Sequence, residues 1–200
     1  MNRKLFLEEV LKTRGDKCDK YCRYAGVNYN FNWCAIFTSY IIREVAGIKD
    51  FPKSISCTQI KNSPFAIPKL NKSFKTAEVG DVILFELNNP SDGPDHIGIV
   101  ISNNNGIISV IEGNTGNINF NNSYVSVYTY SVNNRALDYI IDMSSYFTSD
   151  NIPQKTNSTN LTNSTNSTNS TNSTNSTKSN EAELREVFRK IKELLLSVEI

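Results

Sequence analysis

The residue pattern changes at about residue 80, and this change constrains the fold of the 200-residue chain more than any other feature. Before it, segments 4–13 and 34–46 have helical patterning, and Gly47 offers a natural end for the second helix. After it come five β-rich runs separated by clusters of Asn, Gly and Pro, at residues 81–87, 96–102, 107–113, 124–130 and 137–142. Helices followed by strands predict an α+β domain with N-terminal helices packed on an antiparallel sheet.

Composition divides the chain into three parts. Residues 1–148 hold all four cysteines and the one histidine, and we expect them to form the folded domain. Residues 149–179 are rich in Asn, Ser and Thr and almost free of apolar side chains, so they are predicted to be a flexible linker. Residues 180–200 carry an apolar stripe at spacings of three and four, which predicts an amphipathic helix. That helix could self-associate, which we favour, dock on a partner, or fold back on the domain.

The charge balance and the N-terminus argue against several classes of protein. With 21 Lys and Arg against 20 Asp and Glu, the formal net charge is +1, so we expect neither a nucleic-acid partner nor an anionic membrane. Glu8 and Glu9 interrupt the apolar start that a signal peptide needs, and no run reaches the roughly 18 apolar residues of a membrane span. We expect the protein to be made in the cytoplasm and to act outside it only after release or delivery.

The four cysteines lack the dense spacing of a disulfide scaffold. Cys18 and Cys22 lie four residues apart and could share one helical face, and we interpret them as reduced or buried thiols. A zinc site needs about four nitrogen or sulfur ligands. Because the chain holds a single histidine, we expect no metal and no other cofactor.

Cys34 has the setting expected of a nucleophile. It lies where an Asn-rich loop enters the predicted helix, and the positive end of a helix dipole lowers the pKa of a thiol there. Cys57, in a Ser/Thr-rich loop, is the second candidate. A thiol hydrolase also needs a base that activates the nucleophile and then protonates the leaving amine. His96 is the one histidine, so we predict an amide-hydrolysing site built from Cys34 and His96.

The hairpin that follows His96 predicts which residues orient its imidazole. We expect a three-residue loop, 104–106, with Gly106 in the left-handed conformation that such loops favour. In that register Asn114 lies opposite His96, and Glu112 is a diagonal neighbour on the same face. Either Glu112 or Asn114 could therefore orient the base.

The residues singled out so far belong to four ordered motifs. They are Trp33-Cys34-Ala35-x-Phe37-x-Ser39-Tyr40, Gly80-Asp81-Val82-Ile83-Leu84-Phe85, Asp95-His96-Ile97-Gly98-Ile99-Val100 and Ile111-Glu112-Gly113-Asn114. Together they resemble the CHAP family of cysteine- and histidine-dependent amidohydrolases/peptidases, over roughly residues 5–142. The resemblance implies a papain-like fold and cleavage of bacterial peptidoglycan, at the N-acetylmuramoyl–L-alanine bond or within the stem and bridge peptides. It implies Cys34 as nucleophile, His96 as base, and Glu112 or Asn114 as orienter.

The resemblance also bears on substrate binding. Some relatives bind calcium through an Asp-rich loop before the nucleophile, a pattern that this sequence lacks. The family's oxyanion hole uses the N–H of the nucleophile and a second donor, for which Tyr21, Tyr24 and Asn32 are candidates. Trp33, Tyr24 and Asn32 could contact the substrate in the cleft, although core packing would equally explain Trp33.

The sequence is compatible with three functions. The first is a peptidoglycan hydrolase, of the kind found as a phage endolysin or a tail- or element-borne lysin. The second is a non-catalytic module for wall binding or assembly that acts through residues 180–200, with Cys34 inert. The third is a thiol amidase or intercellular toxin that acts on another amide. The complete set of Cys, His, Glu and Asn favours the first.

Overall fold

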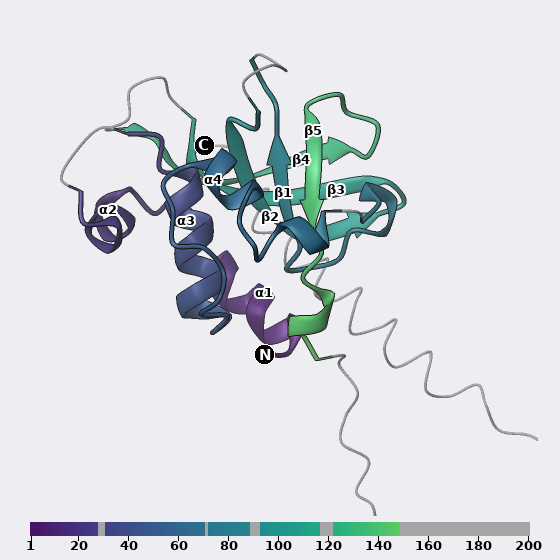
Figure 1. Cartoon of the computed structure of the whole chain (residues 1–200), viewed down its shortest axis with the longest axis horizontal. Coiled ribbons are helices and arrows are strands. Elements are labelled where there is room, and N and C mark those ends of the chain that lie inside the picture. The colour runs from purple at the N-terminus through teal and green to yellow at the C-terminus, as the bar shows by residue number, and fades with distance from the viewer. Residues whose placement is uncertain (28–30, 71, 89–92, 117–121, 149–200) are drawn as a thin grey trace, which may run out of the picture. The chain divides into compact units, whose positions relative to one another are not determined.

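The computed structural model describes residues 1–27, 31–70, 72–88, 93–116 and 122–148. The predicted linker at 149–179 and the predicted helix at 180–200 lie outside these residues. The described part has the α+β architecture that the pattern change predicts. Helices come first, and an antiparallel five-stranded sheet of order β4-β3-β2-β1-β5 follows (Figure 1).

The helical elements of the described residues are α1 (Arg3–Leu11), α2 (Asp19–Ala25), α3 (Cys34–Tyr40), its π-helical continuation η1 (Ile41–Val45), and α4 (Cys57–Lys61). Short 3₁₀ turns are η2 (Ile67–Lys69), η3 (Phe74–Thr76) and η5 (Ser144–Tyr146). The strands are β1 (Val82–Phe85), β2 (His96–Asn104), β3 (Ile107–Thr115), β4 (Tyr124–Ser131) and β5 (Leu137–Ile141). The sequence pattern predicted α1, the α3–η1 helix and all five strands; it did not predict α2 or α4.

The inner strands of the sheet are covered on both faces. Helix α3 packs against β2 and β3, and Figure 1 shows α2 and α3 together on one side of the strands. The main core lies between these helices and one sheet face, and a second apolar cluster covers the other face. Strand β1 is buried along its whole length, as expected for an inner strand of such a layered domain.

Gly113 sets how closely α3 approaches the sheet. A Cβ atom built at this position would lie 2.6 Å from Phe37 Cβ and 2.8 Å from Trp33 Cζ3. Such distances are far inside van der Waals contact, so only glycine allows this packing. The close approach places the first turn of α3, which begins at Cys34, directly against the end of β3.

The β2–β3 hairpin differs from the predicted one at its turn. Asn104 pairs with Ile107, so the loop has two residues, Asn105 and Gly106, and the predicted three-residue loop 104–106 is wrong. Both residues have positive φ, 49° and 86°, as a type I′ turn requires. The Asn-Gly pair is the most favourable sequence for this turn, because its twist matches that of the flanking strands.

A β-bulge compensates for the shorter loop. The strand register shifts by one residue between Val100 and Ser102. On the side of this shift that leads to His96, Ile99 pairs with Ile111. This is the register that the three-residue loop would have produced. The first residues of β2 therefore still face the last residues of β3, as predicted.

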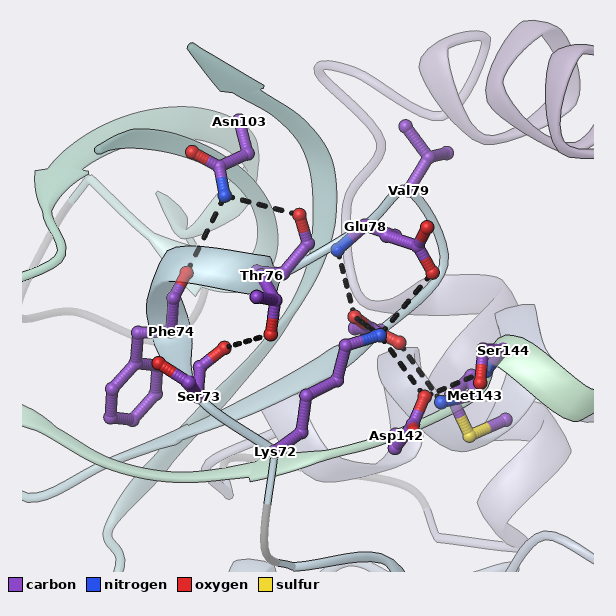
Figure 2. Close-up of polar contacts among 12 residues, drawn as sticks. Lys72, Ser73, Phe74, Thr76, Glu78, Val79, Asn103, Asp142, Met143 and Ser144 are labelled. Carbon is purple, nitrogen blue, oxygen red and sulfur yellow. Dashed lines mark hydrogen bonds and ion pairs between the residues drawn. The ribbon is translucent and has the colours of Figure 1, made fainter. Parts of the chain in front are cut away.

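An ionic network around the buried Asp81 ties the start of β1 to the end of β5 (Figure 2). Lys72 Nζ lies 2.8 Å from the carboxylate of Asp81 and 3.1 Å from that of Asp142. Asp81 is fully buried and also accepts backbone N–H groups of Glu78 and Met143, at 2.8 and 2.9 Å. Since a buried carboxylate requires such partners, the Gly-Asp motif before β1 serves the fold.

Candidate active site

Cys34 is the first residue of α3 and is 2% exposed. The chain enters the helix at Trp33, so the thiol lies beside the unpaired N–H groups of the first turn, and the N–H of Ala35 donates to it. Its sulfur lies 3.8 Å from the sulfur of Cys57, the first residue of α4. These two are the free cysteines of the chain, and both are buried.

His96 opens β2 and joins Cys34 to a buried carboxylate. The imidazole Nε2 lies 2.8 Å from Glu112 Oε2, and the side chains of His96 and Glu112 are 13% and 3% exposed. An ionised carboxylate only accepts hydrogen bonds, so Nε2–H is the donor. Because Glu112 occupies Nε2, the other ring nitrogen, Nδ1, is the one available for the hydrogen bond that His96 makes with Cys34.

The proton affinities of these groups are strongly coupled. The hydrogen bond from Cys57, together with the contact to His96, holds the pKa of Cys34 well below its usual range although burial opposes ionisation. Burial disfavours the charged imidazole, but bonds to Cys34 and Glu112 outweigh it and raise the pKa of His96 to about 10. The bond to Cys34 and burial raise the pKa of Cys57, so Cys57 keeps its proton and donates it. The arrangement therefore favours a thiolate–imidazolium pair near neutral pH.

Asn114, the other predicted orienter, contacts a different residue. Its backbone is in the left-handed region, with φ of 62°, where the β3–β4 register shifts between Glu112 and Thr115. Its side-chain amide donates to Asn32 Oδ1 at 3.3 Å. Asn114 thus ties the end of β3 to the loop that leads into Cys34, while Glu112 contacts the imidazole.

The residues predicted to contact substrate or oxyanion lie in different surroundings. Trp33 is 1% exposed: its indole stacks on Tyr21 at 5.5 Å and donates to Ser123 Oγ at 2.8 Å, so the structure places it in the core. The hydroxyl of Tyr21, also fully buried, donates to Asp16.

Tyr24 and Asn32 lie nearer to the surface. The hydroxyl of Tyr24 donates to Glu44 at 2.9 Å. Asn32 is exposed, and it lies two residues before the nucleophile. Of the predicted binding residues, Asn32 is therefore the one that combines exposure with a position beside Cys34.

Two supporting residues were not predicted as such. Asp95 accepts the backbone N–H groups of Leu87 and Asn88, at 3.0 and 3.1 Å, and so ties the residue before His96 to the chain that follows β1. Gly98 leaves room for Glu112, because a Cβ atom there would lie 2.7 Å from Glu112 Cγ. The motif Asp95-His96-x-Gly98 thus contains the base, His96, and two residues that keep the base and its orienter in position.

The interpretation of Cys18 and Cys22 as reduced thiols is wrong, since the structure joins them in a disulfide across the first turn of α2. Their Cα atoms are 5.5 Å apart, which suits such a bond. Among the residues that the structure describes, no group of three or more His, Cys, Asp or Glu side chains is placed to hold a metal ion. The same part of the chain has no helix long and apolar enough to cross a membrane.

The fold and this geometry together define a class of protein. Helices that cover an antiparallel sheet, with a cysteine at a helix start beside a histidine that opens a strand, form the papain-like α+β arrangement. Residues 24–114 match the family model of the CHAP domain, so this part of the chain belongs to the CHAP family, and the resemblance drawn from the four motifs is confirmed. CHAP domains are typically cysteine- and histidine-dependent amidohydrolases or peptidases of peptidoglycan. Comparison with curated proteins and with solved structures gave no match.

Proposed function

We propose that this chain is a cysteine-dependent peptidoglycan hydrolase with Cys34 as nucleophile, His96 as general acid and base, and Glu112 as orienter. The observation that supports it is the continuous series of contacts from Cys34 to His96 and from His96 Nε2 to Glu112 Oε2, at 2.8 Å. A lone buried thiol would be a core residue, whereas a thiol coupled to an oriented imidazole is an activated nucleophile. Asn114 contacts Asn32 instead, which favours Glu112 as the orienter.

The chemistry follows from the protonation states of this pair. The Cys34 thiolate attacks the carbonyl carbon of the wall amide, and the C–S bond forms as the carbonyl oxygen becomes an oxyanion. The His96 imidazolium then gives its proton to the leaving amine while the C–N bond breaks. Neutral His96 then takes a proton from water, whose oxygen attacks the thioester. The C–S bond breaks, the acid product leaves, and the thiolate–imidazolium pair is restored.

The oxyanion needs two hydrogen-bond donors close to Cys34. The N–H of Cys34 at the start of α3 is the first. Asn32 is our proposal for the second, because its Oδ1 accepts from Asn114 and its Nδ2 amide is then the donor end of the side chain. Since Cys34 is 2% exposed, a substrate carbonyl has to displace neighbouring side chains to reach the sulfur.

We further propose that the substrate bond is either the N-acetylmuramoyl–L-alanine amide or a peptide bond of the stem or bridge. The chain would then act as a phage or mobile-element lysin that reaches the wall by release or delivery. Mass spectrometry of muropeptides digested by wild type and by Cys34→Ala tests this proposal. A new amino-terminal L-alanine would identify an amidase, and any other new amino terminus an endopeptidase. The same digest from both proteins would refute the proposal.

The predicted helix at 180–200 remains a separate proposal for self-association, with docking on a partner or on the domain as the alternatives. Light scattering on the whole chain and on a chain without residues 180–200 tests it, and equal oligomeric states would end the idea of self-association. The alternative function, a non-catalytic wall-binding module, requires that Cys34→Ala changes nothing in any assay of the chain.

A further inference from the structure

Glu112 has a second hydrogen-bond partner in addition to His96. The hydroxyl of Tyr130, on β4, donates to Glu112 Oε1 at 2.8 Å, while Oε2 is 2.8 Å from His96 Nε2. Each oxygen of this carboxylate therefore has its own donor, one from the base and one from a phenol. Because Glu112 is 2% exposed, the protein has to supply these bonds in place of water.

Aromatic contacts fix the position of that phenol. The Tyr130 ring lies 4.9 Å from the Phe85 ring, and Phe85 in turn lies 5.7 Å from the imidazole of His96. Phe85 also pairs with His96 across β1 and β2. Tyr130 and His96 therefore both contact the Phe85 ring. A displacement of the phenol would move the imidazole through Phe85 and through Glu112.

The phenol is suited to remain a donor. Burial and the neighbouring Glu112 carboxylate raise the pKa of Tyr130, so its hydroxyl keeps its proton throughout the range in which the thiolate–imidazolium pair exists. Two opposed donors leave a carboxylate little freedom to rotate. In metal sites, partners of this kind fix the orientation of the ligating histidine, and supporting hydrogen bonds lock site residues in general.

We propose that Tyr130 is a positioning residue: its hydroxyl holds the Glu112 carboxylate in the orientation that fixes His96 against Cys34. This inference rests on the proposed function. Nothing in the four sequence motifs assigns a role to β4. Tyr130 pairs with Ile108, and the two-residue period of the strands places it on the same sheet face as Glu112, whose own partner on β4 is Ser126.

The test compares Tyr130→Phe, which removes one oxygen, with Tyr128→Phe on the same strand. Tyr128 is the matched control because it is 40% exposed and points to the same sheet face by the period of the strand. For Tyr130→Phe we expect kcat for wall hydrolysis to fall about tenfold with little change in KM, since outer partners of this kind contribute about 10–100-fold. The acid limb of the rate profile should also move to higher pH, because a less constrained Glu112 supports the imidazolium–thiolate pair less well.

A second measurement does not depend on turnover. The chain has a single histidine, so its imidazole gives one set of NMR signals whose titration reports the pKa of His96 alone. We expect this pKa to be lower in Tyr130→Phe than in wild type and Tyr128→Phe, and Tyr130→Phe should add little in a Glu112→Gln background. Folding of each variant is checked by circular dichroism.

The outcomes separate the two proposals. If Tyr130→Phe and Tyr128→Phe give the same rate, pH profile and His96 pKa, Tyr130 has no positioning role, whatever the chain hydrolyses. A lower rate without any change in pH profile or His96 pKa would also overturn the inference, because that pattern belongs to a merely structural side chain. Loss of the proposed function appears elsewhere, as equal wall digestion by wild type and Cys34→Ala.

Discussion

The sulfur atoms of Cys34 and Cys57 lie 3.8 Å apart, and this contact bears directly on the reactivity of the nucleophile. The pKa of Cys34 is lowered and that of Cys57 is raised, so the shared proton resides on Cys57. Cys57, the runner-up nucleophile of the sequence analysis, is therefore better described as a donor to the Cys34 thiolate. A hydrogen bond to a charged group contributes about 1.5–3 kcal/mol, which is enough to matter for the fraction ionised.

Replacing Cys57 tests this contribution. In Cys57→Ala the thiolate loses its largest stabilising contact, so the pKa of Cys34 should rise by about one pH unit or more. Cys57→Ser, which keeps a donor, should retain part of the effect. The thiolate absorbance near 240 nm, titrated against pH, measures both variants. Identical titrations of wild type and Cys57→Ala would show that the contact is energetically irrelevant.

The pH dependence of hydrolysis follows from the same pair, with a definite sign on each side. As pH falls through the lowered pKa of Cys34, the nucleophile is protonated and the rate is lost. As pH rises through the His96 pKa of about 10, the imidazolium loses the proton that the leaving amine needs, and the rate falls again. We expect a broad plateau over neutral pH. A profile that only begins to rise near the ordinary thiol pKa of about 8.5 would contradict the ion pair.

Sequence reasoning could reach part of this site at the level of single residues. Cys34 follows from its place at a helix start and His96 from being the one histidine. The two-residue period of the strand opposite His96 gives Glu112 as one of two candidates for the orienter, beside Asn114. Tyr130 could not be found in this way, because it pairs with Ile108 rather than with Glu112, and its hydroxyl reaches Glu112 only along the path that its side chain takes. Cys57 could not be assigned either, since a loop of unknown path separates it from Cys34.

At the scale of elements, the β2–β3 hairpin has the strand register that we predicted near His96, although its turn differs from the predicted one. An Asn-Gly pair in a two-residue turn is more favourable than the expected three-residue loop, and the bulge at Val100–Ser102 restores the pairing near His96. Bulges depend on tertiary packing and leave little trace in a single sequence. The face that each strand residue occupies could be predicted near the site, and the point of the register shift could not.

Gly98 tests how the paired strands support the orienter. In Gly98→Ala the new Cβ would lie 2.7 Å from Glu112 Cγ and 3.0 Å from the carbonyl oxygen of Ile111, so Glu112 has to move away. We expect at least about a tenfold loss of hydrolysis and a lower pKa of His96, because oriented partners contribute roughly 10–100-fold. Asn104→Ala, on an exposed position of the same strand, is the control for β2. Unchanged activity in Gly98→Ala would mean that Glu112 does not have to be held where it is.

The ionic network that joins β1 to β5 should stabilise the domain without serving catalysis. Asp81→Ala leaves the nearly buried Lys72 with weaker partners and removes two backbone hydrogen bonds. Breaking a buried pair from one side costs about 3–5 kcal/mol, so the free energy of unfolding in urea should fall by roughly that amount. Lys75→Ala, at an exposed position close by, should change it by less than about 0.5 kcal/mol. If both variants had the same free energy of unfolding, the Gly-Asp motif would not stabilise the domain in this way.

At the scale of the whole molecule, the change of pattern at residue 80 predicts the α+β class, because helical and strand periods segregate along the chain. The change of pattern did not predict two features of the structure. Helix α2 has only seven residues, too few to show a helical period, and its disulfide joins Cys18 and Cys22, a spacing that is equally compatible with free thiols. The CHAP domain match at residues 24–114 includes the four motifs, which lie on α3, β1, β2 and β3. Three of them supply Cys34, His96 and Glu112, which meet at one end of the sheet.

The central claim is that the Cys34 sulfur, coupled to His96 and Glu112, cleaves an amide bond of the cell wall. Its most direct test is mass spectrometry of purified peptidoglycan incubated with the whole wild-type chain and with Cys34→Ala, after circular dichroism has shown that both are folded. We predict that wild type releases fragments with one new type of amino terminus and that Cys34→Ala releases none above background. Release of the same fragments by Cys34→Ala, or of none by either protein, would contradict the account.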